Sequence, residues 1–120
     1  MTEKVVTSLD QVQEGQAKGF EVDLGGRRPI RLIVVRRDSS FFVFENRCPH
    51  RGTPLDWSPD NFLDSESHHL ICATHGALFR VEDGECISGP CIGESLRSLE
   101  SRTDHGELYV MLPEGAAQAS

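Results

Sequence analysis

Several features that mark other protein classes are scarce or missing in this sequence. No apolar run in the 120 residues approaches the roughly 20 residues that a membrane-spanning helix needs, and the start, MTEKVVTSLDQ, lacks the apolar core of a signal peptide. Basic residues are few, with 12 Lys and Arg against 19 Asp and Glu and a formal net charge of -7. Because nucleic-acid binders usually present a basic face, we expect a soluble, cytoplasmic protein with neither nucleic-acid nor membrane partners.

Cysteine is limited to four residues, Cys48, Cys72, Cys86 and Cys91. In a cytoplasmic protein these thiols are expected to bind metal or stay reduced rather than to form a disulfide framework. The chain is also short, which predicts one domain and leaves no room for a separate catalytic domain. Its 38% hydrophobic and 26% charged residues are enough for one apolar core and exclude a disordered chain.

Turn residues break the sequence into short apolar runs, as in an all-β protein. The Gly-Gly pair at 25–26 and the Asp-Gly pair at 83–84 each separate two such runs and predict hairpins with tight turns. The segment RRDSS predicts a hairpin with a longer loop, and Asp-His-Gly at 104–106 predicts another hairpin. A short helical turn is expected over residues 8–12, capped by Ser8. The regular spacing favours a sandwich or barrel-like domain, and alternation places on one strand face the side chains of Leu108, Val110 and Leu112.

Two short segments combine cysteine with histidine. Cys48-Pro49-His50 and Cys72-Ala73-Thr74-His75 each follow a predicted strand, and a glycine comes soon after each histidine. A loop leaving a strand can direct its side chains to one point, and glycine lets the backbone pass close to a bulky inorganic group. Two such loops facing each other would offer two thiolates and two imidazoles to one site. The predicted metal ligands are therefore Cys48, His50, Cys72 and His75.

Ligand type and spacing indicate which metal this site would bind. Tetrahedral zinc with two Cys and two His is one alternative, but structural zinc loops usually place at least two residues between their two ligands. Only Pro49 separates Cys48 from His50. The close spacing favours a centre with two metal ions, in which the two cysteines hold one iron and the two histidines hold the neighbouring iron. A 2Fe-2S cluster is the favoured cofactor, with zinc as the alternative.

The segments NRCPHRGTPL and LICATHGALFRVEDGECISGPC resemble Rieske iron–sulfur proteins, in particular the small soluble Rieske-type ferredoxins. The resemblance implies the all-β Rieske fold, an antiparallel β-sandwich base with a small cluster-binding subdomain of two opposed loops. It implies a domain over residues 4–112, with the cluster-binding part at about 46–91 and a flexible tail at 113–120.

The resemblance also implies a role for each predicted ligand. Cys48 and Cys72 would ligate the inner iron of the cluster, and His50 and His75 would ligate the outer iron near the surface. The Gly-Pro pair at 89–90 would belong to a third loop, which in the family covers the cluster from the side.

Three positions depart from the high-potential Rieske proteins of cytochrome complexes. Thr53 and Thr74 stand where those proteins carry a disulfide-bonded cysteine pair, and Ala77 stands where they carry a serine that donates a hydrogen bond to a bridging sulfide. Since fewer hydrogen bonds to sulfur favour the oxidised cluster, we expect a midpoint potential in the lower half of the Rieske range of about -150 to +300 mV. Protonated histidine ligands favour the reduced cluster, so the midpoint is expected to fall as pH rises.

The resemblance implies a one-electron carrier rather than an enzyme. We expect it to pass electrons from a flavin- or NAD(P)H-linked reductase to a terminal oxygenase or a similar acceptor. The spacer WSPDNFLDSESHH is a few residues longer than is common in these ferredoxins and leaves the partner open. Two alternatives stand beside this one: a small subunit of a larger reductase, such as a nitrite-reductase-like complex, and a module whose partner binding depends on the redox state of the cluster.

The other chemically reactive or exposed candidates have simpler interpretations. Cys86 and Cys91 are expected to be small buried thiols rather than a disulfide or a second metal pair. At least one of His68 and His69 is expected to be solvated, and His105 is expected to be exposed. Trp57 and Phe62 are expected to pack the long spacer onto the body. Arg51 is expected to affect docking or the potential, with a plain surface arginine as the alternative. A solvated hairpin face is expected for Arg27, Arg28, Arg31, Arg36 and Arg37, with a partner-binding patch as the alternative.

Overall fold

The computed structural model describes residues 2–22, 29–47, 63, 69–72, 76–89 and 92–112. These residues form strands and one short 3-10 helix, η1. In chain order the elements are β1 (Thr2–Ser8), η1 (Leu9–Gln11), β2 (Ala17–Val22), β3 (Ile30–Arg37), β4 (Ser40–Glu45), β5 (His69–Ile71), β6 (Leu78–Arg80), β7 (Cys86–Ser88), β8 (Ser98–Leu99), β9 (Ser101–Asp104) and β10 (Glu107–Leu112). In this part of the chain, no helix has the length and apolarity needed to cross a membrane.

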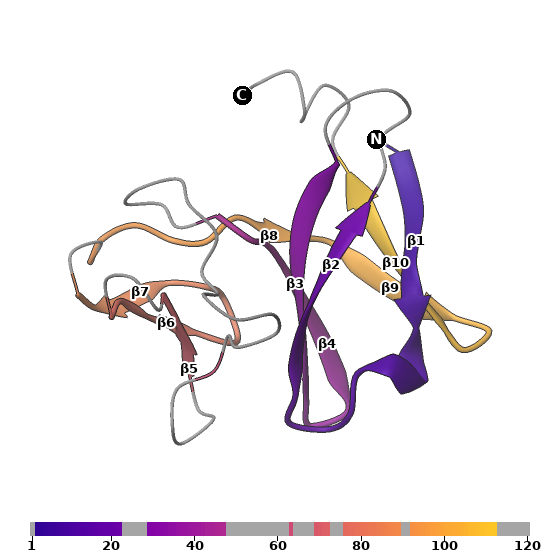
Figure 1. Ribbon diagram of the computed structural model, residues 1–120, viewed down its shortest axis with the longest axis horizontal. Coiled ribbons are helices and arrows are strands. Elements are labelled where there is room, and N and C mark those ends of the chain that lie inside the picture. Colours follow the sequence, from indigo (N-terminus) through magenta and orange to yellow (C-terminus); the bar gives the residue numbers. More distant parts are fainter. Residues whose placement is uncertain are drawn as a thin grey trace.

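The strands form three antiparallel sheets (Figure 1). One sheet has the order β1-β10-β9, a second has the order β2-β3-β4-β8, and a third, smaller sheet has the order β5-β6-β7. The first two sheets pack face to face and form the base of the molecule, while the small sheet lies at one side of it. The all-β prediction, with an antiparallel sandwich base, is confirmed.

Strand β3 contributes to two apolar cores, because successive side chains of a strand point to opposite faces of its sheet. Leu32 and Val34 join the base core, which fills the space between the two larger sheets. Ile33 and Val35 join the small-sheet core, which lies between β3 and β4 on one side and β5, β6 and β7 on the other. The continuous apolar run LIVV, residues 32–35, is thus explained by burial on both faces of the sheet.

The alternation predicted near the C-terminal end of the sequence is confirmed. Leu108, Val110 and Leu112 of β10 are all buried, and all three belong to the base core. The hairpin before them is also confirmed, since Asp104 pairs with Glu107 and the turn consists of His105 and Gly106, both with positive φ.

The loop predicted around RRDSS is tighter than the sequence indicated. Strands β3 and β4 extend to Arg37 and Ser40, which pair with each other, so only Asp38 and Ser39 form the turn. Both turn residues have positive φ, 52° and 64°, as in a type I′ turn. The prediction of a longer loop was wrong because neither residue is a glycine, the usual sign of such a turn.

The other two predicted hairpins differ in detail from the expectation. Strands β2 and β3 pair as predicted, with Val22 opposite Ile30, and the Gly-Gly pair at 25–26 lies outside the described residues. Strands β6 and β7 pair as predicted, but their turn is longer than two residues. The backbone N–H of Arg80 donates to the carbonyl of Glu85, which leaves 81–84 as the turn.

The helical turn near the N-terminus is present as η1, with Ser8 at its N-cap position. The Ser8 hydroxyl makes no cap hydrogen bond to the helix backbone. It donates instead to Oδ1 of Asp10 at 2.8 Å. The predicted element is therefore confirmed, whereas the capping contact predicted for Ser8 was wrong.

Candidate metal centre

The structure describes one of the four predicted metal ligands, Cys72. The other three, Cys48, His50 and His75, lie outside the described residues. Also outside them lie Arg51, Gly52, Thr53, Trp57, Phe62, His68, Thr74, Pro90 and Cys91. Within the described part of the chain, no group of three or more His, Cys, Asp and Glu side chains is placed to hold a metal ion. How the four predicted ligands lie relative to one another therefore stays a prediction.

Cys72 directly follows β5 and is fully buried. Its backbone closes a short loop, because its N–H donates to the carbonyl of Ala77 at 2.9 Å and its carbonyl accepts from the N–H of Gly76 at 2.7 Å. Gly76 has a φ of +70°, a left-handed conformation that glycine adopts without steric cost. The two ends of the predicted second ligand loop, Cys72 to Ala77, are thereby held together.

The chain that leads to the predicted first ligand loop is anchored in the same part of the molecule. Strand β4 ends at Glu45 and is followed by Asn46, which is buried and whose N–H donates to the carbonyl of Arg31 at 2.8 Å. Phe44 of β4 and Cys72 both belong to the small-sheet core. The strands that precede the two predicted ligand loops therefore meet at one apolar core.

The segment after β7 lies directly against the second ligand loop. Gly89 has a φ of +101°, and a Cβ added to it would lie 2.8 Å from the Cα of Ala77. Ala77 is itself fully buried. The two backbones are thus in contact at a point where residue 89 has no space for a side chain.

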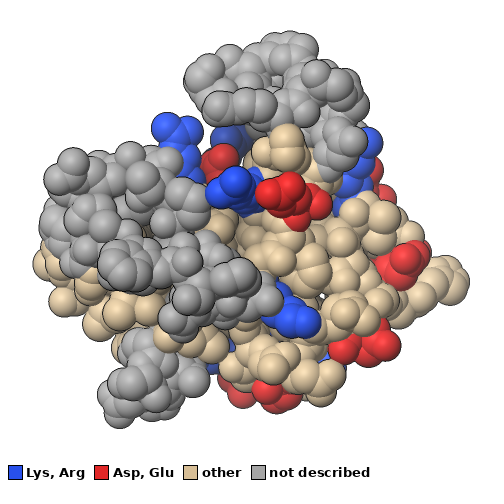
Figure 2. All heavy atoms as spheres, in the orientation of Figure 1, with Lys and Arg blue, Asp and Glu red and all other residues tan. Residues whose placement is uncertain are grey.

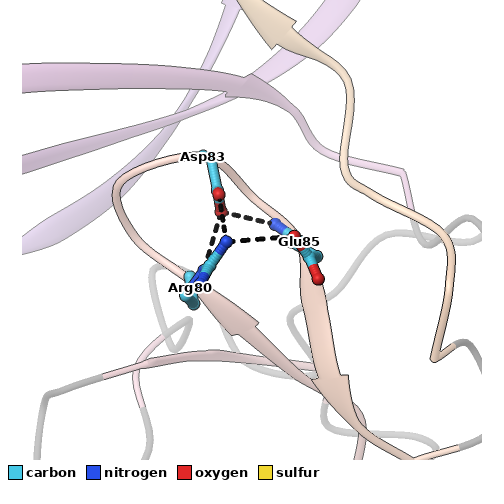
Figure 3. Close-up of polar contacts among 3 residues, drawn as sticks. All are labelled: Arg80, Asp83 and Glu85. Atoms are coloured by element: carbon cyan, nitrogen blue, oxygen red, sulfur yellow. Dashed lines mark hydrogen bonds and ion pairs between the residues drawn. The ribbon is translucent and has the colours of Figure 1, made fainter.

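A polar network stabilises the turn between β6 and β7 (Figure 3). The guanidinium of Arg80 donates to both carboxylate oxygens of Asp83 and, at 3.0 Å, to Glu85. The N–H of Glu85 also donates to Oδ1 of Asp83 at 3.0 Å. The hydrogen bond from Arg80 holds the pKa of the Asp83 carboxyl below its usual value.

The same turn fixes the small sheet to the base. Gly84 lies against Phe44 of β4 so closely that an added Cβ would be 2.8 Å from the ring. Glu82 forms an ion pair of 3.3 Å with Arg37 of β3. The Asp-Gly pair at 83–84 predicts only a turn, and no local pattern indicates the contact of Gly84 with Phe44, which is far away in the sequence.

The other described candidates fall into two groups. His105 is exposed and Cys86 is buried, as predicted, and His69 is half-buried in β5.

The arginines expected on a solvated face differ from one another. Arg31 is exposed beside Glu21, but Arg36 and Arg37 are half-buried, and the Arg36 guanidinium lies over the ring of Phe41, 5.2 Å from its centre.

Charged side chains of both signs are interspersed on the face drawn in Figure 2. Among the described residues on that face, basic groups do not form one continuous surface. The formal net charge of -7 belongs to the whole sequence, with 12 Lys and Arg against 19 Asp and Glu.

The described residues fit a metal–sulfur group at this position. Cys72 offers a thiol, the ligand type that iron–sulfur clusters use, at the end of a strand. The hydrogen bonds of Gly76 and Ala77 fix its backbone, and the small-sheet core shields its inner side.

Comparison with known proteins identifies relatives of this chain. A sequence model of the Rieske 2Fe-2S domain matches residues 2–109. The ferredoxin of carbazole 1,9a-dioxygenase from Nocardioides aromaticivorans IC177 is 27% identical, with a TM-score of 0.72 over 94% of this chain and 100% of that one. A complex of reduced oxygenase and oxidized ferredoxin in carbazole 1,9a-dioxygenase contains a chain that is 27% identical, with a TM-score of 0.68 over 90% of this chain and 91% of that one.

The fold also occurs within a larger protein. The terminal oxygenase of carbazole 1,9a-dioxygenase from Novosphingobium sp. KA1 is 21% identical, with a TM-score of 0.73 over 98% of this chain and 34% of that one. A comparison with curated proteins gives no match.

The family model, the solved structures and the fold lead to one conclusion. The match of the family model extends over nearly all of the described strands, and it includes both Cys–His segments. Proteins of this family bind a 2Fe-2S cluster through two cysteines and two histidines, which favours the cluster over the zinc alternative. The chain belongs to the Rieske 2Fe-2S domain family.

Proposed function

We propose that this chain is a Rieske-type ferredoxin, a one-electron carrier whose cluster ligands are Cys48, His50, Cys72 and His75. The observation that carries the proposal is the similarity to the ferredoxin from Nocardioides, at 27% identity and over 100% of that chain. Ferredoxins of this type carry electrons and do not catalyse a reaction. We extend this to the present chain and propose that it is not an enzyme by itself.

The described residues support the assignment of Cys72 as a ligand. When bound, a 2Fe-2S cluster supplies a centre that accepts and releases one electron. The chain itself supplies a buried thiol, a loop closed by two backbone hydrogen bonds and an apolar core behind that loop. Since Ala77 has no hydroxyl to donate to a sulfide, the midpoint potential stays predicted in the lower half of the range from about -150 to +300 mV.

We propose a terminal oxygenase as the electron acceptor and a flavin- or NAD(P)H-linked reductase as the donor. The acceptor is supported by the similar chain in the complex of oxygenase and ferredoxin. The domain bounds at 4–112, the tail at 113–120 and the cytoplasmic location stay predictions from the sequence.

Two measurements test this function. In a redox titration followed by visible circular dichroism, the purified protein should be reduced reversibly by one electron. In gel filtration of extracts from its host, a carrier should separate from its partners as the salt concentration rises, because exposed charge pairs are screened. Elution in a salt-resistant stoichiometric complex would instead identify a permanent subunit of a larger reductase. Partner affinity that changes on reduction, without electron delivery, would identify a redox-dependent interaction module.

A further inference from the structure

Cys86 is a second buried thiol in the core that contains Cys72. It opens β7 and is 2% exposed. Its N–H donates to the carbonyl of Glu94 at 2.9 Å, and its Sγ lies 3.3 Å from the carbonyl oxygen of Ser88. The thiol therefore donates a hydrogen bond to the backbone two residues further along, where β7 ends.

The backbone between Cys86 and Ser88 contains a β-bulge. Phe79 pairs with Cys86, whereas the preceding residue, Leu78, pairs with Ser88, so Ile87 is the extra residue on β7. A bulge bends its strand and changes the direction of the residues that follow. The hydrogen bond from Cys86 to Ser88 spans the bulge and holds this bend.

Just after the bend, the chain reaches the second ligand loop. Gly89 follows Ser88 and lies on Ala77, where an added Cβ would be 2.8 Å from the Cα of Ala77. The carbonyl of Ala77 accepts the hydrogen bond from the N–H of Cys72 at 2.9 Å. A continuous series of contacts thus leads from the Cys86 thiol through Ser88, Gly89 and Ala77 to the backbone of Cys72.

We propose that Cys86 is a positioning residue for the metal centre: its thiol, bonded to Ser88, holds Gly89 against Ala77 and so keeps the Cys72 loop closed. The proposal rests on the proposed function in taking Cys72 as a cluster ligand. In this role Cys86 acts as a thiol. The role needs neither a disulfide nor a second metal site at this residue. The contact also explains why residue 89 is a glycine, since a side chain there would push the segment after β7 away from Ala77.

The test compares four variants of the full-length protein by two readouts. One readout is hydrogen–deuterium exchange of the peptide that contains Cys72 and Ala77, and the other is the rate at which iron is lost to a chelator. Cys86→Ala and Gly89→Ala should both increase the exchange and speed iron loss about tenfold, since contacts that orient a metal ligand typically contribute that much. Cys86→Ser keeps a donor for Ser88 and should stay within about threefold of the parent protein.

Val81→Ala is the matched control. It truncates a fully buried side chain of the same core without touching the contacts from Cys86 to Cys72. It should lower stability yet leave both readouts near those of the parent. If Cys86→Ala behaves like the parent or like Val81→Ala, the positioning role is contradicted. If Gly89→Ala leaves the exchange of the Cys72 peptide unchanged, the contact between Gly89 and Ala77 does not hold the Cys72 loop closed, and the proposal is contradicted.

The two proposals fail in distinguishable ways. A parent protein that contains zinc or no cluster contradicts the ligand set, while the exchange readout still tests the contacts from Cys86 to Cys72. A parent with a normal cluster and unaltered exchange in Cys86→Ala contradicts the positioning role alone.

Discussion

Glu14 shows how one residue fixes a turn that is distant from it in the sequence. Its carboxylate accepts hydrogen bonds from the backbone N–H groups of Asp38 at 2.6 Å and Ser39 at 2.9 Å. Both turn residues have the positive φ that non-glycine residues adopt at a cost of about 1 kcal/mol or more. The contact with Glu14 offsets part of this cost and keeps the β3–β4 hairpin in register.

The conformation of this turn predicts opposite effects for two neighbouring Ser→Gly substitutions. Ser39→Gly should raise the free energy of unfolding by about 0.5 kcal/mol, because glycine adopts positive φ without strain. Ser40→Gly, one residue further on in β4, should lower it by about 0.5–1 kcal/mol, because there glycine only adds entropy to the unfolded chain. Urea unfolding of both variants measures the difference, and equal effects of the two would contradict the turn assigned here.

Strand β3 contributes side chains to both apolar cores. Val34 and Val35 are adjacent and almost fully buried, yet Val34 contacts the base core and Val35 the small-sheet core. The base core depends on the pairing of β1, β10 and β9, and the small-sheet core contains Cys72. The core that contains Cys72 is thus built on the same strand as the base core.

Truncating Val34 should mainly affect the base core, and truncating Val35 should mainly affect the small-sheet core. Val34→Ala and Val35→Ala should each lower the free energy of unfolding by about 2 kcal/mol, through lost burial and the cavity left behind. Val34→Ala should mainly increase hydrogen exchange in β10, and Val35→Ala in β6. Hydrogen–deuterium exchange by mass spectrometry distinguishes them, and the same exchange pattern in both variants would contradict the two-core description.

An exposed ion pair crosses the β1-β10-β9 sheet. Arg102 of β9 donates to both carboxylate oxygens of Glu3 in β1, at 2.5 and 2.7 Å. These hydrogen bonds hold the pKa of Glu3 below its usual value. A lowered pKa in the folded state adds stability above the unfolded-state pKa, and this stability is lost as the pH falls through the folded-state pKa.

Glu3→Gln should therefore lower the Tm near pH 7 and have little effect at a pH below the folded-state pKa of Glu3. Thermal unfolding of parent and variant at both pH values checks this, with Lys4→Gln, at the adjacent position of β1, as the control. If Glu3→Gln lowers the Tm by the same amount at both pH values, the ion pair between Glu3 and Arg102 is not the cause of the effect.

The sequence predicts local elements well and long-range contacts poorly. The β9–β10 hairpin follows from the turn residues around His105, and the alternation in β10 follows from Leu108 and its partners. The contact of Gly84 with Phe44 depends on the packing of distant segments, as does that of Gly89 with Ala77. No local pattern indicates such contacts. The Cys–His segments were recognisable because their ligand types and spacing are themselves chemical information.

The dimensions of the whole molecule are consistent with an electron carrier. Its shortest extent is 24 Å and its radius of gyration is 13.6 Å, so no bound centre lies far from the surface. Most of the described chain is used to build a sandwich base that supports one small sheet and the loops attached to it.

We propose that two cysteines and two histidines of this chain bind one 2Fe-2S cluster. The most direct test is electron paramagnetic resonance of the dithionite-reduced protein, with iron and acid-labile sulfide counted on the same sample. We expect about two irons and two sulfides per chain, with a reduced-state signal of low average g, because two histidines replace two cysteines on one iron. A colourless protein with one zinc per chain, or a signal typical of a cluster with four cysteine ligands, would contradict it.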